Sequence, residues 1–329
     1  MAMRRSRFLA WLAASAATSL CLPARAQERY PSKPIRFIVP AAVGGPTDVI
    51  GRIVAERLGA GLGQTVIVEN RPGASATLGP AAVAKAAPDG YTLLFTSATP
   101  MVMVPNTMKN VPYDVQKDLL AVSIVGSLPL MLCVNASSPI HSINDLLEQV
   151  RAKPESASYG SFGAGTSAHL MMEILLKQTG LKMIHVPYKG IAPGLQDLIG
   201  GQLMTAVSDI GTAAPLIKGG RVRAIAIAGG GRSTLMPQLP TFAEQGIRGM
   251  EVFAPWMGVF APAGTPADIV ERVSAELVKV AKSPEYATRM APFGIDPTGT
   301  NPARSQETVA TDLRTWKGVV SDLSHIKFE

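Results

Sequence analysis

The chain has 329 residues, of which 47% are hydrophobic, 17% charged and 5% aromatic, and its formal charge is +7 at pH 7. This composition excludes a disordered chain, the two cysteines exclude a disulfide scaffold, and the 31 glycines show no collagen-like period. The length predicts two domains rather than one small core.

The first 26 residues have the pattern of a cleavable bacterial signal peptide. Three arginines precede an apolar run over 8–22, and the sequence Ala-Arg-Ala at 24–26 provides a cleavage site. The run is about 15 residues long, whereas a membrane span needs about 20. We therefore expect export to the periplasm and a cut between Ala26 and Gln27. The general and the twin-arginine export routes both remain open.

The charge of +7 comes mostly from this leader. Its 26 residues contain four arginines and no acidic residue, so the remaining 303 residues carry +3. We expect no nucleic-acid partner and no anionic membrane partner from so small an excess. Of the two cysteines only Cys133 remains, and the apolar stretch 130–134 around it predicts a buried, unreactive thiol.

From residue 27 onward, short apolar runs alternate with helical patterns. Strands are expected at 35–39, 65–69 and 92–96, and helices at 46–58 and 79–86. This order predicts a parallel sheet with right-handed crossovers. The stretch 119–136 then carries no charged residue, and its Gly, Pro and strand formers predict two buried strands that meet at a turn.

A second α/β unit follows the first. The expected strands are 157–160, 182–186, 205–207 and 224–228, and the expected helices are 143–151, 166–178, 193–199 and 213–218. A strand-like segment at 252–260 and helices at 266–282 and 302–322 complete the chain. Two units of roughly 100 to 150 residues each fit the length.

Two glycine-rich turns connect a strand to a helix and are candidate anion sites. In the turn 40–48, Gly44 and Gly45 expose backbone N–H groups at a helix start, although such turns also serve as plain connections. Asp48, in the first helical turn, stabilises the helix by about 0.3–1 kcal/mol and would have to turn aside from a bound anion. The turn 159–170 offers bare amides and small hydroxyls, and its glycines match a dinucleotide fingerprint only loosely.

Further polar groups follow the next two strands. The turn 186–190 carries Lys189, the one cation of these turns, which either pairs with a substrate carboxylate or stays solvated. Asp209 follows the expected strand 205–207. Because ligands in open α/β sheets bind at the carboxyl ends of the strands, we expect these groups to share one edge.

Motifs for catalysis and metal binding are missing from the sequence. It contains no G-x-S-x-G elbow, no H-E-x-x-H, no paired C-x-x-C and no Walker A lysine motif. The four histidines are scattered, and His169, at a helix start, is expected to pack and cap rather than to act as a base. We therefore expect no catalytic residue, no metal and no cofactor.

A series of short motifs along the mature chain resembles those of one family. These motifs are Tyr30-Pro31-x-Lys33-Pro34-Ile35, Gly44-Gly45-x-x-Asp48, Glu69-Asn70-Arg71-Pro72-Gly73-Ala74, Pro88-Asp89-Gly90-Tyr91-Thr92-Leu93-Leu94, Ser161-x-Gly163-x-Gly165-Thr166-x-x-His169-Leu170, Val186-Pro187-Tyr188-Lys189-Gly190, Asp197-Leu198-x-Gly200-Gly201, Trp256 and Ala261-Pro262-Ala263-Gly264-Thr265-Pro266. In this order and coverage the chain resembles the Bug/TctC family, the extracytoplasmic substrate-binding receptors of tripartite tricarboxylate transporters.

This resemblance implies an α/β fold of the periplasmic-binding-protein type, a two-lobed Venus flytrap of type II with hinge crossings between the lobes. Lobe 1 would hold residues 27–124 and 253–329, lobe 2 residues 125–252, and the signal peptide residues 1–26. The hinge crossings would lie at 125–134 and near Trp256, and one ligand would bind in the cleft between the lobes.

The resemblance also implies ligand contacts. Those of lobe 1 fall on Ala41, Gly44, Gly45, Thr47, Asp48, Ser97 and Thr99, and those of lobe 2 on Ser161, Gly165, Thr166, Ser167, Tyr188, Lys189, Gly190 and Asp209. At Ala41 the family usually has an aromatic residue. Its loss removes one wall of the pocket, so the size and shape of the ligand do not transfer to this chain.

The implied function is that of a monomeric, non-enzymatic periplasmic receptor. It would capture a small carboxylate (a di- or tricarboxylate, an acidic amino acid or an aromatic acid) and deliver it to the subunits of a cognate membrane permease. The residues leave two alternatives open: an exported α/β enzyme acting on a small anionic substrate, and a nucleotide-binding oxidoreductase.

Overall fold

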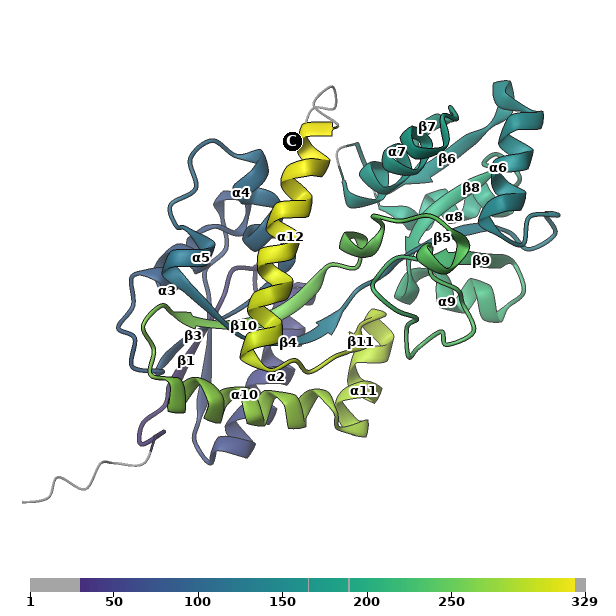
Figure 1. Ribbon diagram of the computed structural model, residues 1–329. Coiled ribbons are helices and arrows are strands. Elements are labelled where there is room, and N and C mark those ends of the chain that lie inside the picture. Colours follow the sequence, from purple (N-terminus) through teal and green to yellow (C-terminus); the bar gives the residue numbers. More distant parts are fainter. Residues whose placement is uncertain (1–29, 165, 189, 323–329) are drawn as a thin grey trace, which may run out of the picture. The chain divides into compact units, whose positions relative to one another are not determined.

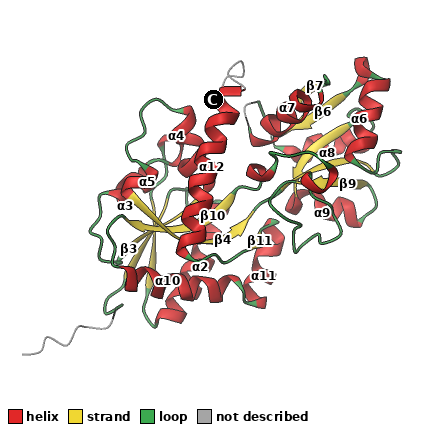
Figure 2. Cartoon of the chain, in the orientation of Figure 1, coloured by secondary structure: helices red, strands yellow, loops and turns green. Residues whose placement is uncertain are grey.

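The computed structural model describes residues 30–164, 166–188 and 190–322. The predicted signal peptide, Gly165 and Lys189 lie outside these described residues. Residues 33–322 lie within one compact unit, which is separate from the short segment before it. This unit contains two lobes, each built from a mixed β-sheet covered by helices (Figures 1 and 2).

The sheet of lobe 1 has six strands in the order β11-β4-β10-β3-β1-β2. The strands are β1 (Ile35–Val39), β2 (Val66–Asn70), β3 (Thr92–Ser97), β4 (Leu119–Ser127), β10 (Trp256–Pro262) and β11 (Asp296–Pro297). β1 lies between β2 and β3 and is parallel to both. β10 is antiparallel to β3 and to β4, so it completes the sheet from a distant part of the chain.

Helices cover this sheet on both faces. They are α2 (Pro46–Leu62), α3 (Leu78–Ala84), α4 (Val104–Thr107), α5 (Val115–Asp118), α10 (Ala267–Ala281), α11 (Pro284–Met290) and α12 (Pro302–Asp322). α10 and α12 pack on β4, and α2 packs on β1, β2 and β3. Four of the five residues of β1 are apolar and at most 1% exposed, which fits a strand that is covered by helices. The rings of Phe37 and Phe95 stack with their centroids 5.8 Å apart.

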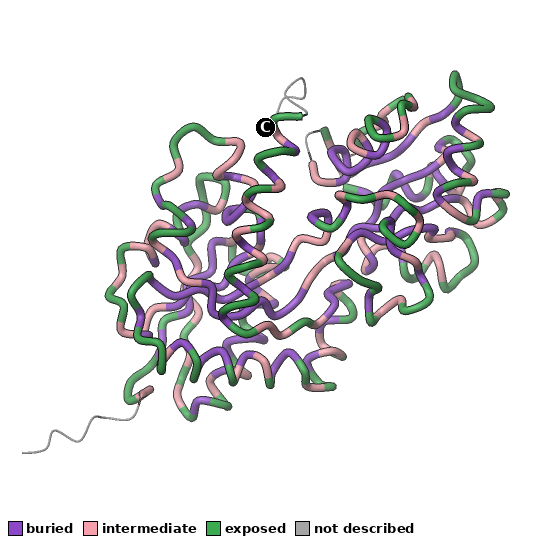
Figure 3. The backbone as a smooth tube through the Cα atoms, viewed as in Figure 1, coloured by how far each residue is buried: buried purple, intermediate pink, exposed green. Residues whose placement is uncertain are grey.

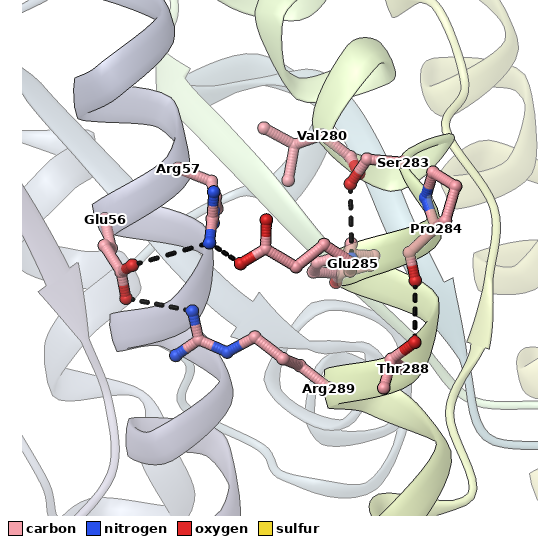
Figure 4. A network of polar contacts seen from close by, with 9 residues as sticks. Glu56, Arg57, Val280, Ser283, Pro284, Glu285, Thr288 and Arg289 are labelled. Carbon is pink, nitrogen blue, oxygen red and sulfur yellow. Dashed lines mark hydrogen bonds and ion pairs between the residues drawn. The ribbon is translucent and has the colours of Figure 1, made fainter.

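Charged side chains join α2 to α11 (Figure 4). Arg57 pairs with Glu285, and Nη1 of Arg289 lies 3.0 Å from Oε2 of Glu56. At the start of α11, Oγ of Ser283 caps the helix by accepting from a backbone N–H of its first turn. Since most of these charged groups are substantially exposed, each ion pair contributes only about 0–1 kcal/mol.

The sheet of lobe 2 has five strands in the order β7-β6-β8-β5-β9. The strands are β5 (Leu130–Asn135), β6 (Ser158–Ser161), β7 (Ile184–Pro187), β8 (Thr205–Asp209) and β9 (Val222–Ile227), and the helices are α6 (Ile143–Ala152), α7 (Ser167–Thr179), α8 (Ile191–Ile199) and α9 (Ile210–Lys218). β6 is parallel to β7 and β8, whereas β5 runs antiparallel to β8 and β9. Three strands therefore end at one edge of this sheet and are followed there by α7, α8 and α9.

The chain crosses between the two sheets twice. It leaves β4 after Ser127 and enters β5 at Leu130, and it returns through residues 228–255 to β10. The crossings are joined by a hydrogen bond of 2.7 Å from the backbone N–H of Leu128 to the carbonyl oxygen of Pro255. The uncharged stretch 119–136 thus forms two buried strands, as expected, but they belong to different sheets and are joined by residues 128–129 without a turn. No helix in the described part of the chain is long and apolar enough to cross a membrane.

The cores of both lobes follow the strands. Figure 3 shows the strands mostly buried and the outward faces of the helices exposed. Cys133 lies inside the sheet of lobe 2 with no exposed surface, and burial, with a smaller effect of Asp209, raises the pKa of its thiol to about 12. The expectation of a buried thiol is therefore confirmed, and its lack of reactivity stays a prediction.

The expected helices and strands are present, with ends that differ by a few residues. The parallel arrangement expected for the strands at 35–39, 65–69 and 92–96 is confirmed, because β1 is parallel to both β2 and β3. Each complete sheet is nevertheless mixed, because β10 and β5 enter antiparallel from remote positions in the chain. The expected strand at 252–260 begins only at Trp256, after a 3-10 turn, η5 (Glu251–Phe253). The other short helical turns are η1 (Ala74–Ala76), η2 (Thr99–Met103), η3 (Pro154–Ser156), η4 (Ala243–Gln245) and η6 (Ala291–Phe293).

Candidate functional site

The predicted contact residues lie where parallel strands end. In lobe 1 the loop 40–45 follows β1, and Ser97 ends β3. In lobe 2, Ser161 ends β6, Tyr188 follows β7 and Asp209 ends β8. Each set therefore occupies the carboxyl edge of its sheet, where ligands of α/β proteins bind.

Asp48 organises the loop between β1 and α2. Its side chain is 1% exposed and accepts hydrogen bonds from the N–H of Gly44 at 2.8 Å, from Nε of Arg52 at 3.0 Å and from Nδ2 of Asn70 at 2.8 Å. Asn70 also donates to the carbonyl oxygen of Ala41 at 3.0 Å. Asp48 has thus turned inward onto its own loop.

The ionisation of Asp48 follows from these contacts. Burial alone would raise its pKa, but the hydrogen bonds from Arg52, Gly44 and Asn70 outweigh burial and lower the pKa to about 2. The carboxylate is therefore ionised and shielded at neutral pH. The exposed surface of the loop is left to backbone groups and to Val43, whose side chain is 73% exposed.

The start of α2 is open to solvent at this loop. Gly44 has φ +81°, which favours glycine, and Gly45 precedes the helix without a side-chain cap. The first amides of a helix have no intrahelical acceptor, so they remain available to an anion. On the neighbouring strand Ser97 is half-buried, and the exposed Thr99 begins the π-helical turn η2.

A cavity of about 500 Å³ lies at the corresponding edge of lobe 2. It is lined by Leu128, Leu130, Phe162, Ser167, Gly190, Ile191, Ala192, Pro193, Asp209, Thr212 and Pro255. Three of the predicted contacts, Ser167, Gly190 and Asp209, belong to this lining. Leu128 and Pro255 come from the two crossings between the sheets, so the cavity adjoins the hinge.

Three helices begin at this cavity. α9 is capped by Asp209, whose Oδ1 accepts from the N–H of Thr212 at 2.8 Å. α7 and α8 begin after Thr166 and Gly190, and no described side chain caps either helix. Their first amides and helix dipoles therefore place positive potential beside the cavity, whose described lining holds no cation and one acidic residue, Asp209, bonded to the start of α9.

Other predicted contacts hold the loops instead of presenting their hydroxyls to the cavity. Oη of Tyr188 donates to Oδ2 of Asp197 at 2.6 Å, and Oγ1 of Thr166 donates to the carbonyl oxygen of Gly163 at 2.7 Å. Ser161 is fully buried. Lobe 1 contributes none of the predicted residues to the lining of this cavity.

The structure brings together two histidines that the sequence separates. The rings of His169 and His185 stack with centroids 3.9 Å apart and planes 8° apart, and the ring of Tyr159 stacks on His185 at 4.9 Å. Burial, with a smaller effect of His169, lowers the pKa of His185 to about 4. His169 thus packs inside lobe 2, as expected, but His185 was not anticipated.

His185 also contacts a predicted residue. Its Nε2 lies 2.7 Å from Oγ of Ser161. The two residues are 24 positions apart and meet because β6 and β7 are parallel neighbours, with Tyr159 beside His185 in register. No local spacing in the sequence signals this pair.

A second cavity of about 500 Å³ lies beside the crossings and α12. Its lining includes residues 228–233, Trp256 and Asp312, and none of the predicted contacts. Burial raises the pKa of Asp312 to about 6, although a hydrogen bond from Trp256 opposes the shift. Among the residues that the structure describes, no group of three or more His, Cys, Asp or Glu side chains could hold a metal ion.

Comparison with known proteins identifies relatives over most of the chain. Residues 50–324 match the model of the tripartite tricarboxylate transporter family receptor. The chain is 35% identical over 321 residues to protein BugT of Bordetella pertussis, which covers 97% of this chain and 98% of BugT.

Two solved structures of the same kind carry a ligand. Rpa4515 of R. palustris with adipate is 31% identical, with a TM-score of 0.66 over 89% of this chain and 97% of the other. MatC from Rhodopseudomonas palustris with bound malate is 28% identical, with a TM-score of 0.63 over 88% of this chain and 100% of the other. With the family match over most of its length, this chain belongs to the tripartite tricarboxylate transporter receptor family, a family of solute-binding receptors.

Proposed function

We propose that this protein is an exported receptor that captures a small carboxylate and delivers it to the membrane subunits of a tripartite tricarboxylate-type transporter. A di- or tricarboxylate is the first candidate, ahead of an acidic amino acid or an aromatic acid. The ligand would be held between the β1–α2 loop of lobe 1 and the helix starts of lobe 2. No chemical step on the ligand is part of this function.

The observation that carries the proposal is the cavity at which α7 and α8 begin. Two helices start there without a described side-chain cap, and Ser167 and Gly190 belong to the lining. Oriented amides favour a carboxylate over a neutral ligand. The volume of about 500 Å³ accommodates a small organic acid.

The ligands of the solved relatives support the same class. MatC is described with malate and Rpa4515 with adipate, and both are dicarboxylates. A dicarboxylate has two anionic ends, which suits a site with open helix starts in both lobes. In this arrangement α2 would take one carboxylate, and α7 with α8 would take the other.

The division into lobes and the cellular location belong to this proposal. We assign residues 27–124 and 253–329 to lobe 1 and residues 125–252 to lobe 2, as the resemblance implies, except that β4 continues in the sheet of lobe 1 to Ser127. The hinges of this proposal lie at the two crossings. Closing of the lobes over the ligand would report occupancy to the permease. The leader at 1–26 would direct the chain to the periplasm and be removed between Ala26 and Gln27.

A melting-shift panel tests the function. Mature protein is heated with mono-, di- and tricarboxylates, acidic amino acids, nicotinate, and a sugar as control, after native mass spectrometry of the freshly purified protein. A ligand at 100 times its dissociation constant stabilises a protein by about 2.7 kcal/mol, which is a clear shift. If a sugar raises the melting temperature and no acid does, the carboxylate assignment is wrong.

The alternative of an exported enzyme rests on one observation, the 2.7 Å contact between Ser161 and His185. A hydroxyl beside an imidazole is the arrangement of an activated nucleophile. Against it stands the complete burial of Ser161, which leaves no room for a substrate carbonyl. Turnover of any acid in the panel, lost in Ser161→Ala, would favour the enzyme.

A further inference from the structure

We propose that His185 is a positioning residue of the ligand site: through Ser161 it holds the turn between β6 and α7 in the shape that receives the carboxylate. The inference rests on the proposed function, because that turn leads into the helix start at the cavity. His185 itself does not line the cavity. It acts through a chain of hydrogen bonds.

This chain begins at the buried hydroxyl of Ser161. Oγ of Ser161 lies 2.7 Å from Nε2 of His185, 3.0 Å from the carbonyl oxygen of Gly163 and 3.2 Å from the N–H of Gly163. The same carbonyl accepts from Oγ1 of Thr166 at 2.7 Å, and Thr166 is the residue that precedes α7. His185 is thus connected to the start of α7 through three residues.

The donor between Ser161 and His185 depends on the tautomer of the imidazole. A serine hydroxyl has one proton to donate and two lone pairs to accept. With a hydrogen on Nε2, His185 donates to Ser161, and Ser161 donates to the carbonyl of Gly163. With the hydrogen on Nδ1, Ser161 donates to Nε2, and the carbonyl of Gly163 still accepts from Thr166. Both tautomers keep one hydrogen bond between His185 and the turn.

Ring stacking holds His185 in place. Its ring contacts those of Tyr159 on β6 and His169 on α7, with centroids 4.9 Å and 3.9 Å away, and the latter two rings lie 6.4 Å from one another. Glu173 anchors both flanking rings: its Oε1 accepts from Oη of Tyr159 at 2.6 Å and lies 3.7 Å from Nε2 of His169. Turning the imidazole of His185 would therefore break its ring contacts with both Tyr159 and His169.

Burial and the neighbouring His169 disfavour a second proton on His185. Burial is the largest effect, the neighbouring His169 adds to it, and Glu173 opposes it. Lys177, Lys182 and Asp322 lie farther out, around the surface cavity that Glu173 lines. Stacked imidazoles repel one another when both are protonated, so an acid solution would open the stack and release the turn.

Two variants separate the hydrogen bond from the stack. His185→Phe keeps an aromatic ring beside Tyr159 and His169 but cannot form a hydrogen bond with Ser161. His185→Gln keeps a donor near Ser161 but removes the ring and its titration. His141→Gln is the matched control, because His141 is an exposed histidine of the same lobe.

The probes are malate and adipate. The readouts are the dissociation constant, the melting temperature, and hydrogen exchange of the amides 161–164, 166 and 167 without ligand. Loss of one buried hydrogen bond changes an equilibrium constant about tenfold. We expect His185→Phe to bind about tenfold more weakly and to exchange these amides about tenfold faster. His185→Gln should bind within about threefold of the unmodified protein, although it loses more of the stacking energy.

If His185 has only a structural role, the affinity of each variant should follow its melting temperature. His185→Gln, which loses more of the stacking energy, should then bind more weakly than His185→Phe. The proposal is overturned if His185→Phe binds and exchanges like His141→Gln, or if it exchanges faster while its affinity is unchanged. Should neither acid bind the unmodified protein, the proposed function has failed for these ligands. The exchange rates of His185→Phe and His141→Gln then decide alone whether His185 holds the turn, and equal rates reject it.

Discussion

Trp256 donates its indole Nε1–H to Oδ2 of Asp312 at 2.8 Å, and this bond ties the first residue of β10 to the middle of α12. The carboxyl group of Asp312 is largely buried, and burial raises its pKa from 3.8 to about 6. A buried carboxylate that ionises at neutral pH carries a desolvation cost. The hydrogen bond from Trp256 therefore stabilises the fold, whereas the negative charge on Asp312 destabilises it.

We therefore expect Asp312→Asn to stabilise the protein at neutral pH. The amide oxygen still accepts from Trp256, and the cost of the buried charge disappears. A folded pKa above the unfolded one means that stability is lost as the pH rises from about 3.8 to about 6. The expected gain is about 1–3 kcal/mol at pH 7 and about zero near pH 3, from urea unfolding. A variant less stable than the unmodified protein at pH 7 would contradict this account.

His185 makes stability depend on pH in the opposite direction. Its pKa falls from 6.5 in the unfolded chain to about 4 in the folded one, so the unfolded chain binds the proton first. Its contribution is complete above pH 6.5 and is lost as the pH falls toward 4. The unmodified protein should therefore melt at a higher temperature than His185→Gln above pH 6.5, and this difference should shrink as the pH falls toward 4. A difference that does not vary with pH would mean that His185 is not the titrating group.

Asp48 is expected to support both the fold and ligand binding. Asp48→Asn removes the charge that holds Gly44, Arg52 and Asn70, at a cost of about 1–3 kcal/mol. Because the β1–α2 loop loses its anchor, affinity for the ligand should fall as well. Asp268→Asn is the matched control, since Asp268 lies exposed in the first turn of α10. Equal stability of the two variants in urea would show that the inward bonds of Asp48 contribute nothing.

Gly45 tests the same loop from the ligand side. Its φ of −72° suits any residue, but an added Cβ would lie 3.3 Å from the carbonyl oxygen of Ala42, which must give way slightly. Gly45→Leu should therefore lower the melting temperature only a little while its side chain blocks the start of α2. Binding should weaken by at least about tenfold, whereas Gly318→Leu, a change in open space on α12, should bind normally. Unchanged affinity in Gly45→Leu would remove this loop from the site.

Cys133 should be unreactive in the folded protein. Its thiol has no exposed surface, and burial raises its pKa to about 12, so the thiolate that reacts is both rare and shielded. A disulfide reagent added to the mature chain should label no thiol under native conditions and one per chain in guanidinium chloride. Fast native labelling would mean that the sheet of lobe 2 opens readily.

Local patterns in the sequence were enough to predict the order of the helices and strands and the sheet edges at which the candidate site lies. Apolar runs marked β1 and β5, a proline and a preceding glycine marked the start of α2, and the glycine-rich turns marked the loops after β1 and β6. Such signals act within a few residues, so they survive in any tertiary arrangement. The family motifs are also short local patterns, so they indicated the receptor family without knowledge of the tertiary structure.

The sequence alone could not assign roles within the site. Asp48 reads equally well as a helix-start acid and as a ligand contact, and only its distances to Gly44, Arg52 and Asn70 show that it faces its own loop. Ser161 reads as an exposed hydroxyl, yet it is buried against His185. These outcomes depend on side chains from different elements that meet in space.

What the sequence determined by itself is therefore local: two α/β units, their strand ends, and a chain of receptor motifs. What only the tertiary structure decided is non-local: the antiparallel entry of β10 between β3 and β4, the stack of His169 on His185, and the bond from Trp256 to Asp312. The physical reason is that strand pairing and side-chain packing join residues far apart in the chain, and no periodicity of a single segment records its partner.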